Sequence, residues 1–383
     1  MTDTMTMSIN QGVVSDLRAR PQHPKNFFDF SRLELEETCN DSGVPKMHAQ
    51  NLFRAAYKDS NPVPWSREGL PKKYAKYCEE KFVGPNLRVV SEHLSQYDRS
   101  VKFVIELSDL RQIEMVLMPE SKRVTLCVSS QVGCAQACVF CHTGRMGLAR
   151  NLDASEIIGQ VWLANKWISE HPQWLVETRL PPQQRITNIV FMGMGEPLDN
   201  VPAVAKSISI MTDPYGLNLA IRRISVSTAG HLDGLEELVK IHPAVRLAIS
   251  VHSAIDAERS KIMPINRRWP LAQLIQKLRS LPTQQENGLL IQYTLISGVN
   301  DSLRHAEKLV EILDGLNVKI NIIPLNPVGP SRLKAPETHQ LEIFRDKIYK
   351  SGVRVMVRYS KGQDIAAACG QLVIQPNISQ VHS

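Results

Sequence analysis

Three closely spaced cysteines constrain this chain more than any other feature of its sequence. Cys134, Cys138 and Cys141 follow the apolar run 123–130, which has the pattern of a buried strand, and Cys127 lies within that run. Thiolates are soft metal ligands. Closely spaced cysteines in a chain without a secretory signal favour metal binding over disulfides. We therefore expect a metal site directly after a strand.

The number of local thiols bears on which metal this loop holds. A structural zinc site takes four tetrahedral ligands, usually as C-x2-C pairs or a Cys/His set. Only three cysteines are local here, and His142 is the nearest candidate for a fourth ligand. Three thiolates leave one iron of a cubane cluster without a protein ligand, which is useful where a substrate or cofactor binds that iron. A zinc knuckle, or incidental buried cysteines, is the alternative.

Length, composition and charge place broad bounds on the protein. A chain of 383 residues is long enough for one large and one smaller domain. Its content of 43% hydrophobic and 22% charged residues is ordinary for a soluble protein. The first twenty residues hold no apolar core of signal-peptide length, and no apolar run approaches a membrane span. We therefore expect a cytoplasmic protein with no membrane partner. The net charge of +7 leans towards a polyanionic partner. Cys39 and Cys78 have no partner pattern and are expected to be buried structural residues.

Strand-like and helix-like segments alternate regularly after residue 121. Near-continuous apolar strands that are each followed by a helical pattern argue for a parallel sheet covered by helices. Six such units are too few for a closed eight-stranded barrel, so we expect an α/β fold, an open partial (β/α)6 barrel with its active site at the strands' carboxyl ends. A doubly wound open sheet is the alternative. The expected strands are 123–130, 186–193, 222–228, 245–251, 288–296 and 318–325, with a last strand at 353–359. The expected helices lie near 154–170, 200–213, 232–240, 270–281, 302–314 and 338–351.

The segments before the barrel differ from it in composition. We expect a flexible tail over 1–28, a helical accessory domain over 29–92, a short β extension over 93–120, the barrel over 121–372 and a tail over 373–383. Between residues 45 and 90, nine Lys or Arg side chains stand against four acids. A basic helical unit with aromatic residues could hold an RNA backbone. A solvated helical surface is the other interpretation.

Polar residues and glycines gather directly after the expected strands, where such a barrel places its active site. Loops after strands are polar in any fold, so each residue alone is a weak signal. A glycine-flanked glutamate suits a ligand's ammonium group, and hydroxyl, imidazole and amide groups suit a ribose and an adenine. The converging set is Gly195, Glu196, Ser227, Ser250, His252 and Asn326. Glu114 is a separate candidate for an active-site residue. It is an acid in an apolar strand, and its side chain faces either solvent or an active site.

Short motifs spread over residues 110–372 define a narrower similarity. They are CVSSQVGC at 127–134, GMGEPLDN at 193–200, SVSTAG at 225–230, PIN at 264–266, GVNDS at 298–302, PLNP at 324–327 and AACGQL at 367–372. The cysteine spacing alone resembles the signature of the radical SAM superfamily. Together, the motifs resemble the RlmN/Cfr family of radical SAM RNA methyltransferases. That resemblance implies a partial (β/α)6 barrel with an N-terminal accessory domain that grips RNA.

The resemblance also implies the cofactors and the residues that bind them. A [4Fe-4S] cluster is held by Cys134, Cys138 and Cys141, and its open iron binds S-adenosylmethionine (SAM). An electron donor reduces the cluster, and the protein acts as a monomer. His142 stands where relatives commonly carry a small residue, which bears on the cluster's potential. The SAM contacts implied by the resemblance are Gly195, Glu196, Ser227, Ser250, Val251, His252 and Asn326.

Three catalytic roles follow from the same resemblance. One SAM methylates Cys369, and a second is cleaved to a radical that takes hydrogen from the S-methyl group, whose carbon then adds to an adenine. Glu114 removes the ring proton. Cys127 attacks the sulfur of Cys369, which releases the product and leaves a disulfide for a thiol reductant. The expected reaction is methylation of adenosine C2 in rRNA or tRNA, and methylation of C8 in 23S rRNA is the alternative.

Two other functions stay open at this point. A radical SAM enzyme that acts on a small molecule or a protein would have no special role for Cys369. A non-catalytic iron–sulfur or zinc RNA-binding protein would have no need for the polar residues at the strand ends. The agreement of several widely spaced motifs favours the RNA methyltransferase over both.

Overall fold

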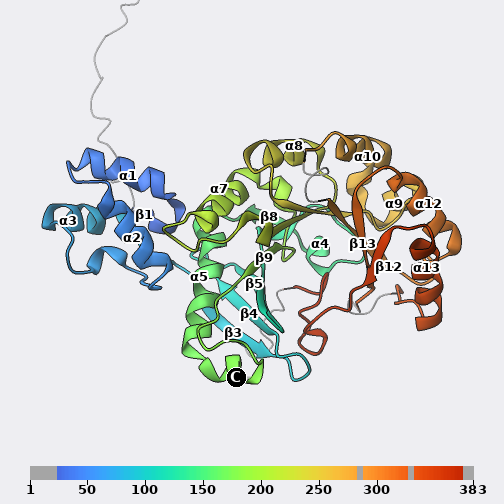
Figure 1. Cartoon of the computed structure of the whole chain (residues 1–383), viewed down its shortest axis with the longest axis horizontal. Coiled ribbons are helices and arrows are strands. Elements are labelled where there is room, and N and C mark those ends of the chain that lie inside the picture. The colour runs from blue at the N-terminus through green and yellow to red at the C-terminus, as the bar shows by residue number, and fades with distance from the viewer. Residues whose placement is uncertain (1–23, 283–287, 327–331, 374–383) are drawn as a thin grey trace, which may run out of the picture.

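A ten-stranded mixed sheet runs through the main body of the protein (Figure 1). The computed structural model describes residues 24–282, 288–326 and 332–373. Parallel pairings join β6, β9, β10, β11, β12, β13 and β14 in chain order. Their bounds are Arg123–Val128, Asn188–Phe191, Ile224–Thr228, Arg246–Ser250, Leu289–Leu295, Val318–Pro324 and Arg354–Val357. These strands carry the predicted apolar runs.

The sheet is open, and its strand order decides between the two expected folds. Within the described residues, β14 pairs with β13 alone, so the parallel strands do not close on β6. A doubly wound sheet would reverse its strand order at a switch point, whereas this order follows the chain throughout. The partial barrel is confirmed. The carboxyl ends of all its strands therefore meet at one edge.

Helices lie around the outside of the curved sheet, as Figure 1 shows for α7, α8, α10, α12 and α13. Their apolar faces pack on the strands, most of which are largely buried, although the edge strand β14 is not. The long helices close to the predicted ranges are α5 (Ala154–Glu170), α7 (Val201–Thr212), α8 (Leu232–Ile241), α10 (Leu271–Arg279), α12 (Leu303–Leu313) and α13 (Thr338–Lys350). Shorter helices are α4 (His142–Met146), α6 (Pro172–Glu177) and α9 (Asp256–Ile262).

Three antiparallel strands extend the sheet beyond β6. They are β3 (Arg88–Leu94), β4 (Val101–Glu106) and β5 (Gln112–Glu120), and β5 pairs with β6. The sequence predicted a short β extension over 93–120 that leads into the cysteine-bearing strand, and β3 begins inside the range expected to be helical. The apolar face of β4 and β5 explains why these strands join the main sheet, because it needs the rest of the sheet and its helices to cover it. A two-stranded hairpin of β7 (Gln131–Cys134) and β8 (Gly147–Asn151) stands apart from this sheet.

The N-terminal unit consists of helices with a two-stranded pairing. The helices are α1 (Arg32–Asp41), α2 (Met47–Tyr57) and α3 (Lys72–Lys81), and β1 (Lys25–Asn26) runs parallel to β2 (Phe82–Val83). Ser31 and Glu34 cap α1 reciprocally. Phe27 and Phe28 are fully buried, so residues 24–28 are packed rather than part of a flexible tail. Cys39 and Cys78 are buried in this unit, as expected.

Polar and aromatic contacts fix the N-terminal unit to the barrel. Arg32 forms an ion pair with Asp213 at 2.9 Å. The backbone N–H of Ser155, at the start of α5, donates to Asp29 at 2.7 Å. The ring of Phe28 also meets Trp162 of α5 edge-on, with centroids 6.1 Å apart. Across the described residues, no helix is both long and apolar enough to cross a membrane.

Candidate active site

The hairpin of β7 and β8 holds the loop that contains the three clustered cysteines. Gly133 has a φ of +79°, and a Cβ at this position would lie 1.9 Å from the carbonyl oxygen of Gly147. Only glycine fits this approach of two backbones. The backbone N–H of His142 donates to the carbonyl of Gly370 at 2.8 Å. The cysteine loop therefore touches the distant segment that carries Cys369.

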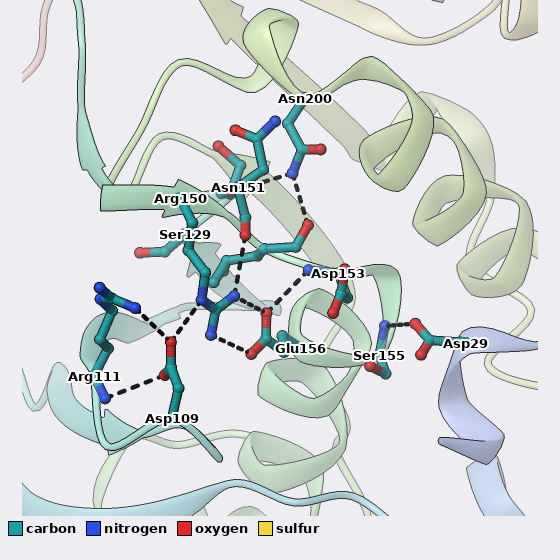
Figure 2. Close-up of polar contacts among 12 residues, drawn as sticks. Asp29, Asp109, Arg111, Ser129, Arg150, Asn151, Asp153, Ser155, Glu156 and Asn200 are labelled. Atoms are coloured by element: carbon teal, nitrogen blue, oxygen red, sulfur yellow. Dashed lines mark hydrogen bonds and ion pairs between the residues drawn. The ribbon is translucent and has the colours of Figure 1, made fainter. Parts of the chain in front are cut away.

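A network of charged and polar side chains anchors β8 to the body of the protein (Figure 2). Arg150 lies between Asp109 in the β4–β5 turn and Glu156 of α5, and donates to both carboxylates at 2.7–2.8 Å. The hydrogen bonds from Arg150 and from Arg111 hold the pKa of Asp109 far below its usual range. The amide of Gln131 donates to Asn151 at 2.8 Å across the hairpin. These contacts hold the hairpin that carries the cysteine loop against α5 and the β4–β5 turn.

Cys134, Cys138 and Cys141 line one cavity at the carboxyl ends of the strands. Cys134 and Cys138 are buried and Cys141 is half-buried. Burial raises the pKa of the Cys134 thiol to about 12 and holds the pKa of Cys138 even higher. A free thiol here stays protonated, and a bound metal would deprotonate it. The prediction that these three cysteines lie together is confirmed.

Glu196 is a buried carboxylate in the wall of the same cavity. Its two oxygens accept hydrogen bonds from the backbone N–H groups of Leu198 at 3.1 Å and Ala229 at 2.8 Å. Its own N–H donates to Gln131 at 2.8 Å. Gly195, with a φ of +106°, leaves no room for a Cβ against Gln131. Burial raises the pKa of Glu196 to about 7, so a cationic ligand would stabilise its ionised form.

His252 faces the cavity as a neutral imidazole. Its Nδ1 accepts a hydrogen bond from the N–H of Thr294 at 2.8 Å, so the ring proton lies on Nε2. Burial, with Arg259 nearby, lowers the pKa of His252 to about 3. Phe140 meets the ring edge-on with centroids 4.8 Å apart. Asn300 donates to the carbonyl of His252 at 2.5 Å and stabilises its positive φ of +54°. His252 can therefore offer one fixed donor.

The two predicted serines share a partner that the sequence did not suggest. Ser227 and Ser250 both line the cavity, and both hydroxyls donate to the Oε1 of Gln292, at 3.0 and 3.4 Å. Gln292 lies in β12, within a largely apolar strand. A polar residue in such a strand is a signal that could have marked Gln292 as a site residue. The sequence does not show which residues it contacts.

Cys369 lies between this cavity and a second one. It lines both, and Cys127 on β6 lines the second. Asn326, a predicted SAM contact, donates to the carbonyl of Cys369 at 3.0 Å. Cys127 is buried and Cys369 is exposed. Burial raises the pKa of the Cys127 thiol, and the guanidinium of Arg358 in the second cavity opposes this increase. The two cysteines, 242 residues apart in the chain, thus meet at one site as free thiols.

Glu114 is buried beside this site but lines neither cavity among the described residues. It forms an ion pair with Lys102 at 3.1 Å and accepts a hydrogen bond from the N–H of Val373 at 2.8 Å. Burial raises the pKa of Glu114, and Lys102 partly offsets that increase. Lys102 also donates to the carbonyl of Ala366 at 3.4 Å. The pair therefore contacts the Cys369 segment on both sides of the cysteine.

Val251 and Arg259 lie next to the carboxyl end of β11. Val251 is fully buried and does not line the cavity, and its backbone N–H donates to the carbonyl of Gln292 at 3.0 Å. Arg259 of α9, also fully buried, donates to the carbonyls of Val251, Ala229 and Ser250 at 2.7–3.0 Å. Arg259 could not be predicted as a site residue, because a charged residue on a short polar helix gives no sign of burial.

Comparisons with known proteins match this geometry to a family. Residues 128–310 match the Radical SAM superfamily. The chain is 38% identical to the dual-specificity RNA methyltransferase RlmN of Campylobacter lari, over 91% of this chain and 97% of that protein. The chain belongs to the RlmN family. The RlmN protein of Pseudomonas fluorescens is 42% identical, with 91% of this chain and 90% of that protein covered. A solved radical SAM methyltransferase from Sphaerobacter thermophilus is 37% identical, with a TM-score of 0.83 over 91% of this chain and 99% of that one. The protein is therefore a radical SAM RNA methyltransferase.

Membership in the RlmN family implies an iron–sulfur cluster and SAM, and the residues present fit both. Three thiols face one cavity together with a buried carboxylate, a neutral imidazole donor and two serine hydroxyls. In the part of the chain that is described, no three His, Cys, Asp or Glu side chains are grouped to hold a single metal ion. Ligands of a cubane cluster need no such grouping, because each cysteine binds a different iron.

Proposed function

We propose that this RlmN-family enzyme methylates C2 of an adenosine in ribosomal or transfer RNA by way of a methylated Cys369. The observation that carries the proposal is the place of Cys369 in the walls of two adjoining cavities. One cavity contains the cluster cysteines and all the proposed SAM contacts except Val251, and the other contains Cys127. A thiol in this place can accept a methyl group on one side and deliver it on the other.

The second cavity has the character of a site for a nucleobase. Its walls are mostly apolar and also include several polar and charged groups. The apolar residues are Val116, Met118, Val190, Met192, Ile323, Val357 and Leu372, and the polar ones include Glu120, Arg358, Tyr359, Ser360 and Lys361. An adenine must leave its stack to enter such a site, which favours a loop or a single strand of RNA as substrate.

The proposed chemistry assigns a step to each residue around Cys369. When bound, the cluster and SAM supply the methyl group and the radical that removes one hydrogen from it. The carbon on Cys369 then bonds to adenine C2, and Glu114 accepts the C2 proton. The Cys127 thiolate attacks the sulfur of Cys369, so that an S–S bond forms, the C–S bond breaks, and the freed carbon gains a proton. These steps release one electron, which balances the electron consumed in forming the radical. An electron donor and a thiol reductant prepare the enzyme for the next turnover.

Nucleoside analysis of RNA treated with the holoenzyme tests this proposal. We expect Cys369→Ala to abolish methylation, and Cys127→Ala to stop at a covalent protein–RNA thioether, because the C–S bond can no longer be broken. Cys78→Ala, which removes a buried thiol outside both cavities, serves as the control and should retain activity. NMR of the product would show loss of the H2 signal. Loss of H8 instead would establish C8 methylation, and full activity of Cys369→Ala would refute the proposal.

A further inference from the structure

Gln292 is a buried polar side chain at the boundary of the two cavities. It is 7% exposed and lines both of them, as Cys369 does. Its Oε1 accepts from Ser227 and Ser250, and its Nε2 lies 3.5 Å from the sulfur of Met192. A thioether sulfur is only an acceptor, so the amide nitrogen must face Met192 and the oxygen must face the serines. The orientation of the amide is thus set by its surroundings.

This orientation determines what the two serines can offer a ligand. A serine hydroxyl has one proton to donate and two lone pairs that accept. Both hydroxyl protons are directed at the same oxygen of Gln292. Ser227 and Ser250 therefore present acceptors, not donors, to the cavity. A complementary ligand must carry two neighbouring O–H donors, and the cis-diol of a ribose is such a group.

We propose that Gln292 is a positioning residue that makes Ser227 and Ser250 acceptors for the two ribose hydroxyls of SAM. It would thereby fix the nucleoside end of SAM against Cys369. The role of this alignment in methyl transfer rests on the proposed function, whereas recognition of the ribose does not. Small misplacements of a reacting group reduce rates strongly, so a loosely held ribose would also waste SAM as 5′-deoxyadenosine without methylation.

Equilibrium binding tests the proposal without turnover. The holoenzyme with an oxidised cluster is dialysed anaerobically against SAM and against its 2′-deoxy and 3′-deoxy analogues. We expect Gln292→Leu to weaken SAM binding about tenfold, as for loss of one or two net hydrogen bonds. Binding of each deoxy analogue should change less, because one of the affected hydrogen bonds is already missing. The preference of the wild type for SAM over its analogues should therefore shrink.

Two further variants separate positioning from general damage. Gln292→Glu retains an acceptor oxygen, and should restore most of the preference for SAM. Gln160→Leu removes another buried glutamine, which bonds the backbone of Ser129 and lines neither cavity. It should affect SAM and the two analogues in equal proportion. An equal loss for all three ligands in Gln292→Leu, or no loss, would overturn the proposal. Failure of the enzyme to methylate RNA would count against the proposed function alone.

Discussion

At the scale of single residues, the pairing of Lys102 with Glu114 links acid–base chemistry to the position of Cys369. Both side chains are buried, and the ion pair of 3.1 Å has little solvent to screen it. Each partner also contacts the backbone of the Cys369 segment, Lys102 at Ala366 and Glu114 at Val373. The proposed proton acceptor is thus tied to the segment that carries the methyl group.

Replacing Lys102 by Met should shift the pH dependence of methylation. Glu114 accepts a proton only when ionised, so activity rises as pH increases through its pKa, which burial raises and Lys102 lowers. Loss of the cation removes the lowering effect, and an opposite charge at this distance typically accounts for about one to three pH units. We expect the ascending limb of the pH–rate profile to move to higher pH by about that amount. Lys102→Arg keeps the charge and should move it little. If the ascending limb of the pH–rate profile does not shift in Lys102→Met, Glu114 is not a proton acceptor whose pKa Lys102 lowers.

Which site residues could be predicted depended on whether their signal is local. Cys134 and Glu196 stand in short motifs directly after strands, where the fold places active-site groups. Gln292, Lys102 and Arg259 act through partners that are distant in sequence. Sequence periodicity shows that such residues interrupt an apolar strand or lie on a polar helix. It does not show which neighbours they meet.

At the scale of elements, the regular alternation of strand and helix made the barrel predictable. The β7–β8 hairpin could not be predicted in this way. The barrel strands are apolar runs of the length expected for strands buried on both faces. The hairpin lacks that signal, because its strands are short and their pairing shifts register between Val132 and Gly133. It is held by Arg150 and by a close backbone approach at Gly133, neither of which a hydrophobic pattern records.

Gly133→Ala should therefore disrupt cluster loading. The new Cβ would meet the carbonyl oxygen of Gly147 at 1.9 Å, and backbone must move to relieve the clash. Gly298→Ala is the matched control, since its φ of +67° is similar but nothing lies within 4 Å of its Cβ. The control should lose only about 1–2 kcal/mol of stability from backbone strain. We expect less iron per chain after reconstitution in Gly133→Ala and normal iron in Gly298→Ala. Equal iron contents would contradict this account of the hairpin.

At the scale of the whole molecule, the docked helical unit adds a basic surface to the catalytic body. Arg32, Asp29 and Phe28 attach this unit to α5 and to the segment after α7. Lys72, Lys73 and Lys76 of α3 are exposed. Their charges are therefore free to meet a polyanion. The sequence suggested this possibility from composition, but only the packing shows which lysines are left in solvent.

Reversing these charges tests whether the unit grips RNA. We expect the triple variant Lys72→Glu, Lys73→Glu, Lys76→Glu to weaken RNA binding. The slope of log K against log salt should also fall by about one for each RNA phosphate that the variant no longer neutralises. SAM affinity and iron content should not change, because α3 lies outside both cavities. Reversal of Arg304, Lys308 and Lys350 on α12 and α13 changes the net charge equally and separates local RNA binding from a general electrostatic effect. If both triple variants show the same fall in RNA affinity and in salt-dependence slope, the helical unit is not the RNA-binding surface. Its lysines are then ordinary solvent-exposed residues of the helix.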